Sequence, residues 1–238
     1  GQMMGHFGQV TADKYGFTRE QMDAFAIESV TRAQKAVADG SFAAEIAPVT
    51  ISSRRGDVTV SDDETPGVVR IDKIPTLRPA FAKDGTVTAA TSSSISDGAA
   101  AVVMMAEAEA QRRNLQPIAR IIAHSAFAHE PAWFTTAPVC ALKALHRRLD
   151  WTPADVDLYE INEAFAVVTM AAMADVGIGH EKVNVNGGAC ALGHPIGATG
   201  CRITTTLVHA LRARGLRRGI ATQCIGGGEA TAIAIEII

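Results

Sequence analysis

Three glycine-flanked clusters in the second half of the sequence carry side chains that could do chemistry. The first covers residues 184–200 (NVNGGACALGHPIGATG), and its only group that titrates near neutral pH is His194. Gly193 permits close backbone approach, Pro195 fixes the turn, and the helix predicted to follow offers free N–H groups. An imidazole at such a rigid junction can serve as a general base or a hydrogen-bond donor. On these residues alone, a phosphate-binding loop or a capped turn with an incidental histidine remains an alternative.

The second cluster places a thiol in front of three glycines. Cys224 ends a strand-like segment, and Ile225 separates it from residues 226–228, whose backbone N–H groups can be exposed. This arrangement favours an acid/base thiol beside an oxyanion pocket. The alternative is a small buried hydrophobic residue, which is the usual state of a free cysteine.

The third cluster covers residues 160–165 (EINEAF), at a predicted strand-to-helix junction. The amide of Asn162 could hydrogen-bond a water molecule or a substrate oxygen. An N-cap of the following helix is an equally good interpretation of the same residue.

These clusters depend on regular elements to position them. Residues 18–37 space their apolar side chains as an amphipathic helix does, Thr18 with Gln21 resembles a capping box, and the helix should end near Gly40. Turn-forming residues in 41–84 predict short strands and loops.

Regular α/β structure is expected after Gly85. Between it and residue 117 we predict a strand over 86–88, a loop over 91–97, and a helix or a strand leading into a helix over 98–113. Further on, strands are predicted over 119–126, 155–161, 183–185, 218–224 and 229–238, and helices over 137–149, 163–176 and 198–214. This alternation predicts an α/β fold: a mostly parallel sheet covered on both faces, closed by two adjacent strands.

The composition limits the class of protein. The chain has 238 residues, 47% of them hydrophobic, and a formal charge of −3 without long runs of either sign, so nothing indicates a nucleic-acid partner. Its four cysteines lack CxxC spacing, which favours reduced thiols and a cytoplasmic location. No apolar run reaches the roughly 18 residues that a membrane span needs. Because the sequence starts at Gly1 without a methionine, an N-terminal targeting segment cannot be judged.

Taken in order, Asn162-Glu-Ala-Phe, Gly193-His194-Pro195 and Cys224-Ile-Gly-Gly-Gly resemble the three C-terminal active-site motifs of the thiolase family. The resemblance extends through residues 77–81, 85–89 and 97–100 and covers essentially the whole chain. It implies a layered α/β/α/β/α sandwich of two related βαβαβαββ halves, with a loop domain inserted in the first half. In this chain, it implies a CoA-covering loop domain over residues 1–85, the closing segment of the N-terminal half over 86–117, and the C-terminal thiolase domain over 118–238.

The same resemblance implies covalent catalysis. A cysteine in the first half takes an acyl group from acyl-CoA, and an acetyl-CoA enolate then attacks it; the reverse reaction is thiolytic cleavage of a 3-ketoacyl-CoA. His194 would activate that cysteine and bind the thioester oxygen, with Asn162 positioning a water in the same oxyanion hole. Cys224 would move the α-carbon proton, and the N–H of Gly226 would help form a second oxyanion hole. We expect the imidazole and the aimed amides to lower the pKa of the Cys224 thiol.

The resemblance also implies contacts to substrate. Ser93 would contact the pantetheine arm and Phe134 would border the acyl pocket. Apolar walls would come from Met4, Leu77, Phe81, Ala89, Ala164 and Phe165. Candidates for the CoA phosphates are Lys14, Arg19, Arg54, Arg55, Lys73 and Arg78. No metal and no tightly bound cofactor is implied; coenzyme A and acetyl-CoA enter as substrates.

The sequence departs from the family pattern in several places. Met3-Met4-Gly5 stands where short-chain acetoacetyl thiolases usually carry a histidine before Met-Gly, and Cys190 replaces a usual aliphatic residue, which leaves the acyl chain length open. The Cys-x-Ser-Gly segment of the family nucleophile is absent. We therefore expect the chain to be inactive alone and to associate with an N-terminal thiolase half, as part of a homodimer or homotetramer.

Two alternatives remain. A β-ketoacyl synthase shares the fold but uses a Cys-His-His arrangement, which the segment after Cys224 disfavours. A non-catalytic, thiolase-derived fragment that binds CoA or lipid would not need the missing cysteine.

Overall fold

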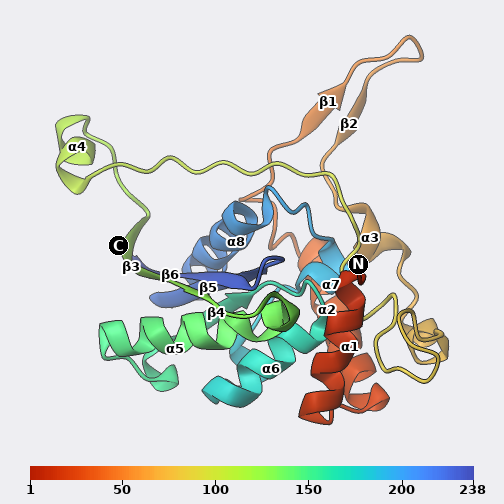
Figure 1. Cartoon of the computed structure of the whole chain (residues 1–238). Helices are drawn as coiled ribbons and strands as arrows, with labels where there is room; N and C mark the ends of the chain where they lie inside the picture. Colours follow the sequence, from red (N-terminus) through yellow and green to blue (C-terminus); the bar gives the residue numbers. More distant parts are fainter.

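A four-stranded sheet organises the C-terminal half of the chain; the computed structural model describes residues 1–238 (Figure 1). Its strands, in chain order, are β3 (Ala119–Ala128), β4 (Leu158–Ile161), β5 (Arg218–Ile225) and β6 (Glu229–Ile237), and they lie side by side in the order β3-β6-β5-β4. The pair β4/β5 is parallel, whereas β6 runs antiparallel to both β3 and β5.

The sheet is therefore mixed rather than mostly parallel. Strands β3, β4 and β5 share one direction, but β6 follows β5 after a short turn and so must return beside it in the opposite direction. The predicted pair of adjacent strands at the end of the chain is confirmed.

Helices cover both faces of this sheet (Figure 1). Helix α5 (Ala137–Leu149) packs on one face, with α6 (Ala166–Val176) beside it, and α8 (Thr199–Ala213) packs on the other. Leu142 and Leu145 belong to the core on the α5 side, and Leu207 and Leu211 to the core on the α8 side. The α/β class with layered helices and sheet is confirmed, and α5 has the predicted bounds.

Two helices open the chain and pack against the α6 side of the molecule: α1 (Met4–Tyr15) and α2 (Arg19–Ala38). The capping box of α2 is confirmed, because Thr18 Oγ1 accepts from Gln21 N at 3.3 Å and Gln21 Oε1 accepts from Thr18 N at 2.9 Å. Helix α1 was not predicted. Its glycines are bad helix formers, but a Cβ on Gly5 would overlap the ring of Phe81, so packing requires the glycine there.

Residues 41–84 form the predicted mixture of short strands and loops, with two short helices that were not foreseen. Strands β1 (Val49–Ile51) and β2 (Val58–Val60) make an antiparallel hairpin that projects from the body (Figure 1). Helix α3 (Glu64–Val68) and a 3-10 helix (Ile71–Thr76) lead back to the body. The remaining short helices are α4 (Glu107–Arg112), α7 (Ala189–Leu192) and three 3-10 turns (Pro131–Thr136, Pro153–Asp155 and His180–Lys182).

Three predicted elements are wrong in part. Residues 86–88 are not a strand, because Thr86 N and Val87 N both donate to the side chain of Gln9, at 2.8 and 3.1 Å. Residues 183–185 contribute a single bridge between Val183 and Tyr159. Residues 98–113, predicted as a helix or as a strand leading into a helix, are helical only in α4; residues 98–105 before it are extended but pair with no strand, because their backbone makes no hydrogen bond to other backbone groups of the chain. No helix is long and apolar enough to cross a membrane.

Candidate active site

His194 lies on the loop between α7 and α8, and its backbone is fixed from the neighbouring segment. Its N–H donates to Ser94 O at 3.0 Å, and the preceding Gly193 has a φ of +86°. A side chain at Gly193 would also overlap Ser96 Oγ. The glycine is therefore required both by its conformation and by the close approach of the 94–96 segment.

The hydrogen bonds of His194 assign its tautomer. Nδ1 lies 2.7 Å from Thr199 Oγ1, and that hydroxyl gives its own hydrogen to Pro195 O at 3.0 Å. The hydroxyl must therefore accept from an Nδ1–H, which leaves the lone pair on Nε2. Burial, and then the charge of Arg202, lower the pKa of His194, so the ring is neutral at pH 7. A neutral imidazole with a free Nε2 lone pair can accept a proton.

The side chain of Asn162 faces the Nε2 atom of this imidazole. Its Nδ2 lies 3.4 Å from His194 Nε2, and its backbone N–H donates to Thr222 O at 3.0 Å, at the end of β4. Asn162 Oδ1 is buried and has no hydrogen-bond partner in the chain. The predicted pair Asn162 and His194 is thus brought together, with an amide oxygen left free to receive a donor.

Cys224 lies at the end of β5, before the turn into β6, and is 8% exposed. It packs in an apolar cluster with Phe134, Ala164 and Phe165. Burial raises the pKa of the Cys224 thiol to about 12, opposed only in part by a backbone hydrogen bond. The predicted lowering of this pKa is wrong, because apolar side chains surround the sulfur and penalise the thiolate.

The glycine turn after Cys224 is tightly built. Gly228 has a φ of +104°, and a Cβ there would overlap His129 O. Gly226 approaches Met4, whose Cε would lie 3.3 Å from a Cβ added to the glycine. The predicted site residues Met4 and Gly226 are therefore neighbours, although they are 222 positions apart in the sequence.

Only some of the side chains predicted to form apolar walls lie together. The ring of Phe165 makes edge contacts with Phe81 and Phe134, at centroid distances of 6.0 and 6.5 Å. Ser93 is held against this cluster, because its N–H and its hydroxyl both donate to Ala164 O, at 3.1 and 2.9 Å. Leu77 is half-buried and Ala89 exposed, and neither belongs to the cluster around Cys224.

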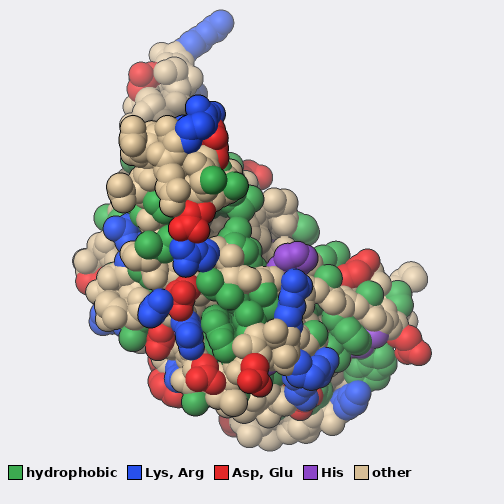
Figure 2. Space-filling view, turned by 90° about the vertical axis from the view of Figure 1, so that its left-hand side faces the viewer, with side chains coloured by type: hydrophobic (Ala, Val, Ile, Leu, Met, Phe, Trp, Pro, Cys, Tyr) green, Lys and Arg blue, Asp and Glu red, His purple; other side chains and the backbone are tan.

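The basic candidates for CoA phosphates are not gathered at one place. The guanidinium of Arg19 already donates within the chain, to Asp23 Oδ2 at 2.8 Å and to Leu77 O at 2.7 Å. Lys14 lies over the ring of Trp133, 4.1 Å from its centroid. Lys73 pairs with Asp72 at 3.6 Å, and Arg78 is exposed. Residues 54–55 lie in the turn of the projecting β1–β2 hairpin, where Figure 2 shows a basic side chain at the tip.

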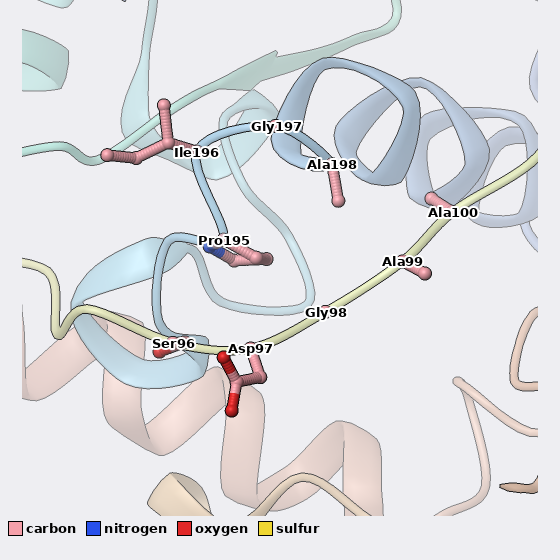
Figure 3. Close-up of a pocket in the computed structure, with 9 residues that line it drawn as sticks. All are labelled: Ser96, Asp97, Gly98, Ala99, Ala100, Pro195, Ile196, Gly197 and Ala198. Atoms are coloured by element: carbon pink, nitrogen blue, oxygen red, sulfur yellow. The ribbon is translucent and has the colours of Figure 1, made fainter.

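A hollow of about 400 Å³ adjoins the His194 loop, between the start of α8 and the extended segment (Figure 3). It is lined by Ser96, Asp97, Gly98, Ala99, Ala100, Pro195, Ile196, Gly197 and Ala198. The two walls touch at one end, since a Cβ on Gly98 would lie 2.7 Å from Pro195 Cγ. In Figure 3 the Asp97 carboxylate and the Ile196 side chain point away from the hollow, so backbone and small side chains line it.

Sequence reasoning missed four residues that hold this site together. They are Thr199, Glu163, Asn184 and Ser29, all buried. The hydroxyl of Thr199, the first residue of α8 and five positions after His194, was a local signal that could have been found. Ser29 could not have been found this way, because it meets Glu163 across 134 positions.

Comparison with known proteins agrees with the fold and with the three motifs. The family model described as "Thiolase, N-terminal domain" matches residues 1–108, and the one described as "Thiolase, C-terminal domain" matches residues 115–237. The layered α/β fold, with an amide and a thiol at strand ends and a histidine on the loop between α7 and α8, is thus that of the thiolase-fold proteins. The chain belongs to the thiolase family.

Particular relatives are similar over nearly the whole chain. A probable acetyl-CoA acetyltransferase of Dictyostelium discoideum is 48% identical over 99% of this chain and 57% of its own length. The structure of the Bacillus anthracis acetyl-CoA acetyltransferase superposes with a TM-score of 0.97 at 43% identity, covering 100% of this chain and 60% of the relative. The Acat5 thiolase from Ascaris suum, in complex with coenzyme A, gives 0.88 at 39% identity with the same coverage. The chain therefore spans about three fifths of the length of these relatives.

Proposed function

We propose that this chain is the loop domain and C-terminal part of a thiolase that transfers acyl groups between coenzyme A thioesters. The observation that carries the proposal is the Nδ1–H tautomer of His194, whose unprotonated Nε2 faces the amide nitrogen of Asn162 at 3.4 Å. The relatives named acetyl-CoA acetyltransferase, and one relative bound to coenzyme A, support the substrate class.

In thiolysis, a cysteine thiolate attacks the keto carbon of a 3-ketoacyl-CoA and breaks the bond to the α-carbon. His194 Nε2 takes the proton of that cysteine, and Asn162 with the imidazole stabilises the oxyanion. The departing acetyl-CoA enolate takes a proton from Cys224, while Gly226 N–H binds its oxygen. The Cys224 thiolate then takes the proton of a second coenzyme A thiol, whose sulfur attacks the acyl-cysteine. The nucleophilic cysteine leaves as a thiolate and regains its proton from His194.

The raised pKa of Cys224 suits this direction. A thiol whose pKa is about 12 is protonated at neutral pH, and so is ready to donate to the enolate carbon. In the condensation direction the same sulfur must remove the α-proton as a thiolate, which is the costlier state in its apolar surroundings. Phe134 packs in the same apolar cluster as Cys224, so it would border the acyl group and limit the acyl chain that fits.

We further propose that the nucleophilic cysteine comes from a thiolase half outside these 238 residues. None of Cys140, Cys190 or Cys201 has the Cys-x-Ser-Gly neighbours. The chain exposes 12522 Å² of surface, against about 10,200 Å² expected for a compact monomer of 25.0 kDa. Part of the excess is the extended segment, where Val103 and Met104 are 87% and 68% exposed. Unpaired extended backbone with exposed apolar side chains is suited to pairing with another part of a protein.

The division into residues 1–85, 86–117 and 118–238 belongs to this proposal. The boundary near residue 117 is supported by the two family ranges, which meet between residues 108 and 115. A homodimer or homotetramer, a role in fatty-acid metabolism and a cytoplasmic location complete it; the four free cysteines are in keeping with a reducing compartment.

The test is an assay of the complete gene product with acetoacetyl-CoA and with longer 3-ketoacyl-CoA substrates, following thiolysis in the presence of coenzyme A. We expect Cys224→Ala to lower kcat by at least about 100-fold, the scale of a lost acid/base group. The matched control is Cys201→Ala, a half-buried thiol on α8. Full activity of Cys224→Ala would refute its role. Coenzyme A binding without any turnover by the wild type would favour the non-catalytic alternative.

A further inference from the structure

Glu163 is a completely buried carboxylate next to Asn162 in the chain. It has three hydrogen-bond partners. Ser29 Oγ lies 2.7 Å and Cys190 N lies 3.0 Å from its Oε2, and Asn184 Nδ2 lies 2.8 Å from its Oε1. A backbone N–H can only donate, so at least Cys190 fixes the carboxyl as an acceptor.

The other two partners are forced to donate by their own neighbours. Ser29 Oγ already accepts the N–H of Gly188 at 3.0 Å, which leaves its hydrogen for Glu163. Asn184 Oδ1 accepts from Ile161 N at 2.8 Å, so its amide nitrogen must face Glu163. The Glu163 carboxylate is therefore the acceptor in all three hydrogen bonds. Burial raises the pKa of Glu163, and the three donors oppose that rise by favouring the ionised form.

This carboxylate joins the two loops that carry the oxyanion residues. On one side it binds Cys190 N in the first turn of α7, and His194 follows only four positions later. On the other side it binds Asn184, whose amide holds both the N–H and the C=O of Ile161, at 2.8 and 2.9 Å. Ile161 directly precedes Asn162. The contact between Asn162 and His194 thus depends on one shared anchor.

The Glu163 carboxylate is tightly packed, with no space for larger residues at the glycines beside it. A Cβ on Gly188 would overlap the Glu163 carboxylate, and a Cβ on Gly187 would lie 2.6 Å from Ser29 O. Helix α2 therefore presses directly on the loop that leads to His194. Through Ser29, the first part of the chain helps to fix a site built in the second.

We propose that Glu163, with Asn184 as its partner, is the positioning residue that sets the separation of Asn162 Nδ2 and His194 Nε2. Its catalytic consequence rests on the proposed function. Glu163 touches neither oxyanion residue with its side chain and acts only through the loops that it joins. A glutamine would not replace it: with its oxygen toward Ser29 and Cys190, its NH₂ would face the NH₂ of Asn184, two donors against each other.

The test compares Glu163→Gln, Asn184→Asp and their double variant in the complete gene product. Asn186→Ala is the matched control, because Asn186 is a buried amide in the same loop whose side chain bonds only to Arg214, at 3.2 Å. Two readouts are taken: kcat and KM for thiolysis, and the ring ¹⁵N resonances of His194 in histidine-labelled protein, assigned by their loss in His194→Gln.

We expect each single variant to lower kcat about 10- to 100-fold, the range found when residues that orient functional ligands are lost. KM should change less than about twofold, and the His194 resonances should move. The double variant restores a donor–acceptor pair of reversed polarity, so it should lose less than the product of the two single losses. The control should stay within about twofold of wild type, with unmoved resonances.

The proposal is overturned if a folded Glu163→Gln keeps both kcat and the His194 resonances, or if Asn186→Ala loses as much activity. Should Glu163→Gln not fold, Ser29→Ala takes its place, since it removes one donor and keeps the carboxylate. We expect about a threefold to tenfold loss of kcat there, and unchanged kcat and resonances would again overturn the proposal. If the wild type shows no thiolysis, the proposed function fails, and the His194 resonances alone decide the positioning role.

Discussion

Replacing Thr199 by valine should disable His194 without removing it. Valine keeps the shape of the side chain but takes away the oxygen that accepts from His194 Nδ1 at 2.7 Å. Thr199 is completely buried, so water does not replace the lost acceptor. Leaving the Nδ1–H unpaired costs about 1–3 kcal/mol. The imidazole can avoid this only by moving its proton to Nε2, where it would face the NH₂ of Asn162.

Either outcome disfavours proton transfer to Nε2: an unpaired Nδ1–H destabilises the imidazolium that forms, and the other tautomer has no lone pair on Nε2. Since about 1.4 kcal/mol is tenfold in an equilibrium, kcat for thiolysis should fall about 5- to 150-fold. Thr204→Val is the control, because Thr204 Oγ1 makes the same bond to the carbonyl four residues back, at 2.8 Å, and does not touch His194. The ring ¹⁵N shifts of His194 report the tautomer directly. A Thr199→Val protein with kcat within twofold of wild type and an unchanged Nδ1–H tautomer would refute the assignment.

Three further predictions concern stability. Gly187→Ala should lower the free energy of unfolding by more than about 3 kcal/mol in urea, because its φ is +82° and the Cβ would lie 2.6 Å from Ser29 O; Gly215→Ala, with φ +64° and open space around it, should cost only about 1 kcal/mol. Burial raises the pKa of Glu160 from 4.5 to about 8, so its contribution to stability is complete below pH 4.5 and is lost as pH rises toward 8; Glu160→Gln should therefore flatten the fall in Tm between pH 4.5 and 8. Burial lowers the pKa of His146 below 6.5, so stability is lost as pH falls below that value, and His146→Gln should flatten the fall in Tm from pH 7 to 5.

Elements whose cause is local could be predicted from the sequence. Helix α2 starts where Thr18 and Gln21 can cap each other, and α5 carries Pro138 in its first turn and leucines on one face, so residue types within a few positions fix their bounds. The close succession of β5 and β6 likewise follows from the short glycine turn between them.

Elements that form because of contacts distant in the sequence could not be predicted. Helix α1 contains Gly5 and Gly8, which lower helix propensity, and only the ring of Phe81 packed on Gly5 explains why glycine is needed there. The strand predicted over 86–88 fails for the same kind of reason, because the side chain of Gln9 takes the N–H groups that a sheet would have used.

His194 and Cys224, the two groups proposed to handle protons, differ in how far this chain determines their state. Each hydrogen bond that orients His194 comes from within the chain, through Ser94, Thr199 and Asn162, so its base-ready tautomer is a property of this sequence. Cys224 is different: the glycines beside it indicated an activated thiol, but Phe134 and Phe165 bury the sulfur and raise its pKa. If Cys224 acts as proposed, its deprotonation must be favoured by groups that the substrate or another part of the protein supplies. On the proposed function, the histidine side of the site is preformed and the thiol side is the one that assembly and substrate binding complete.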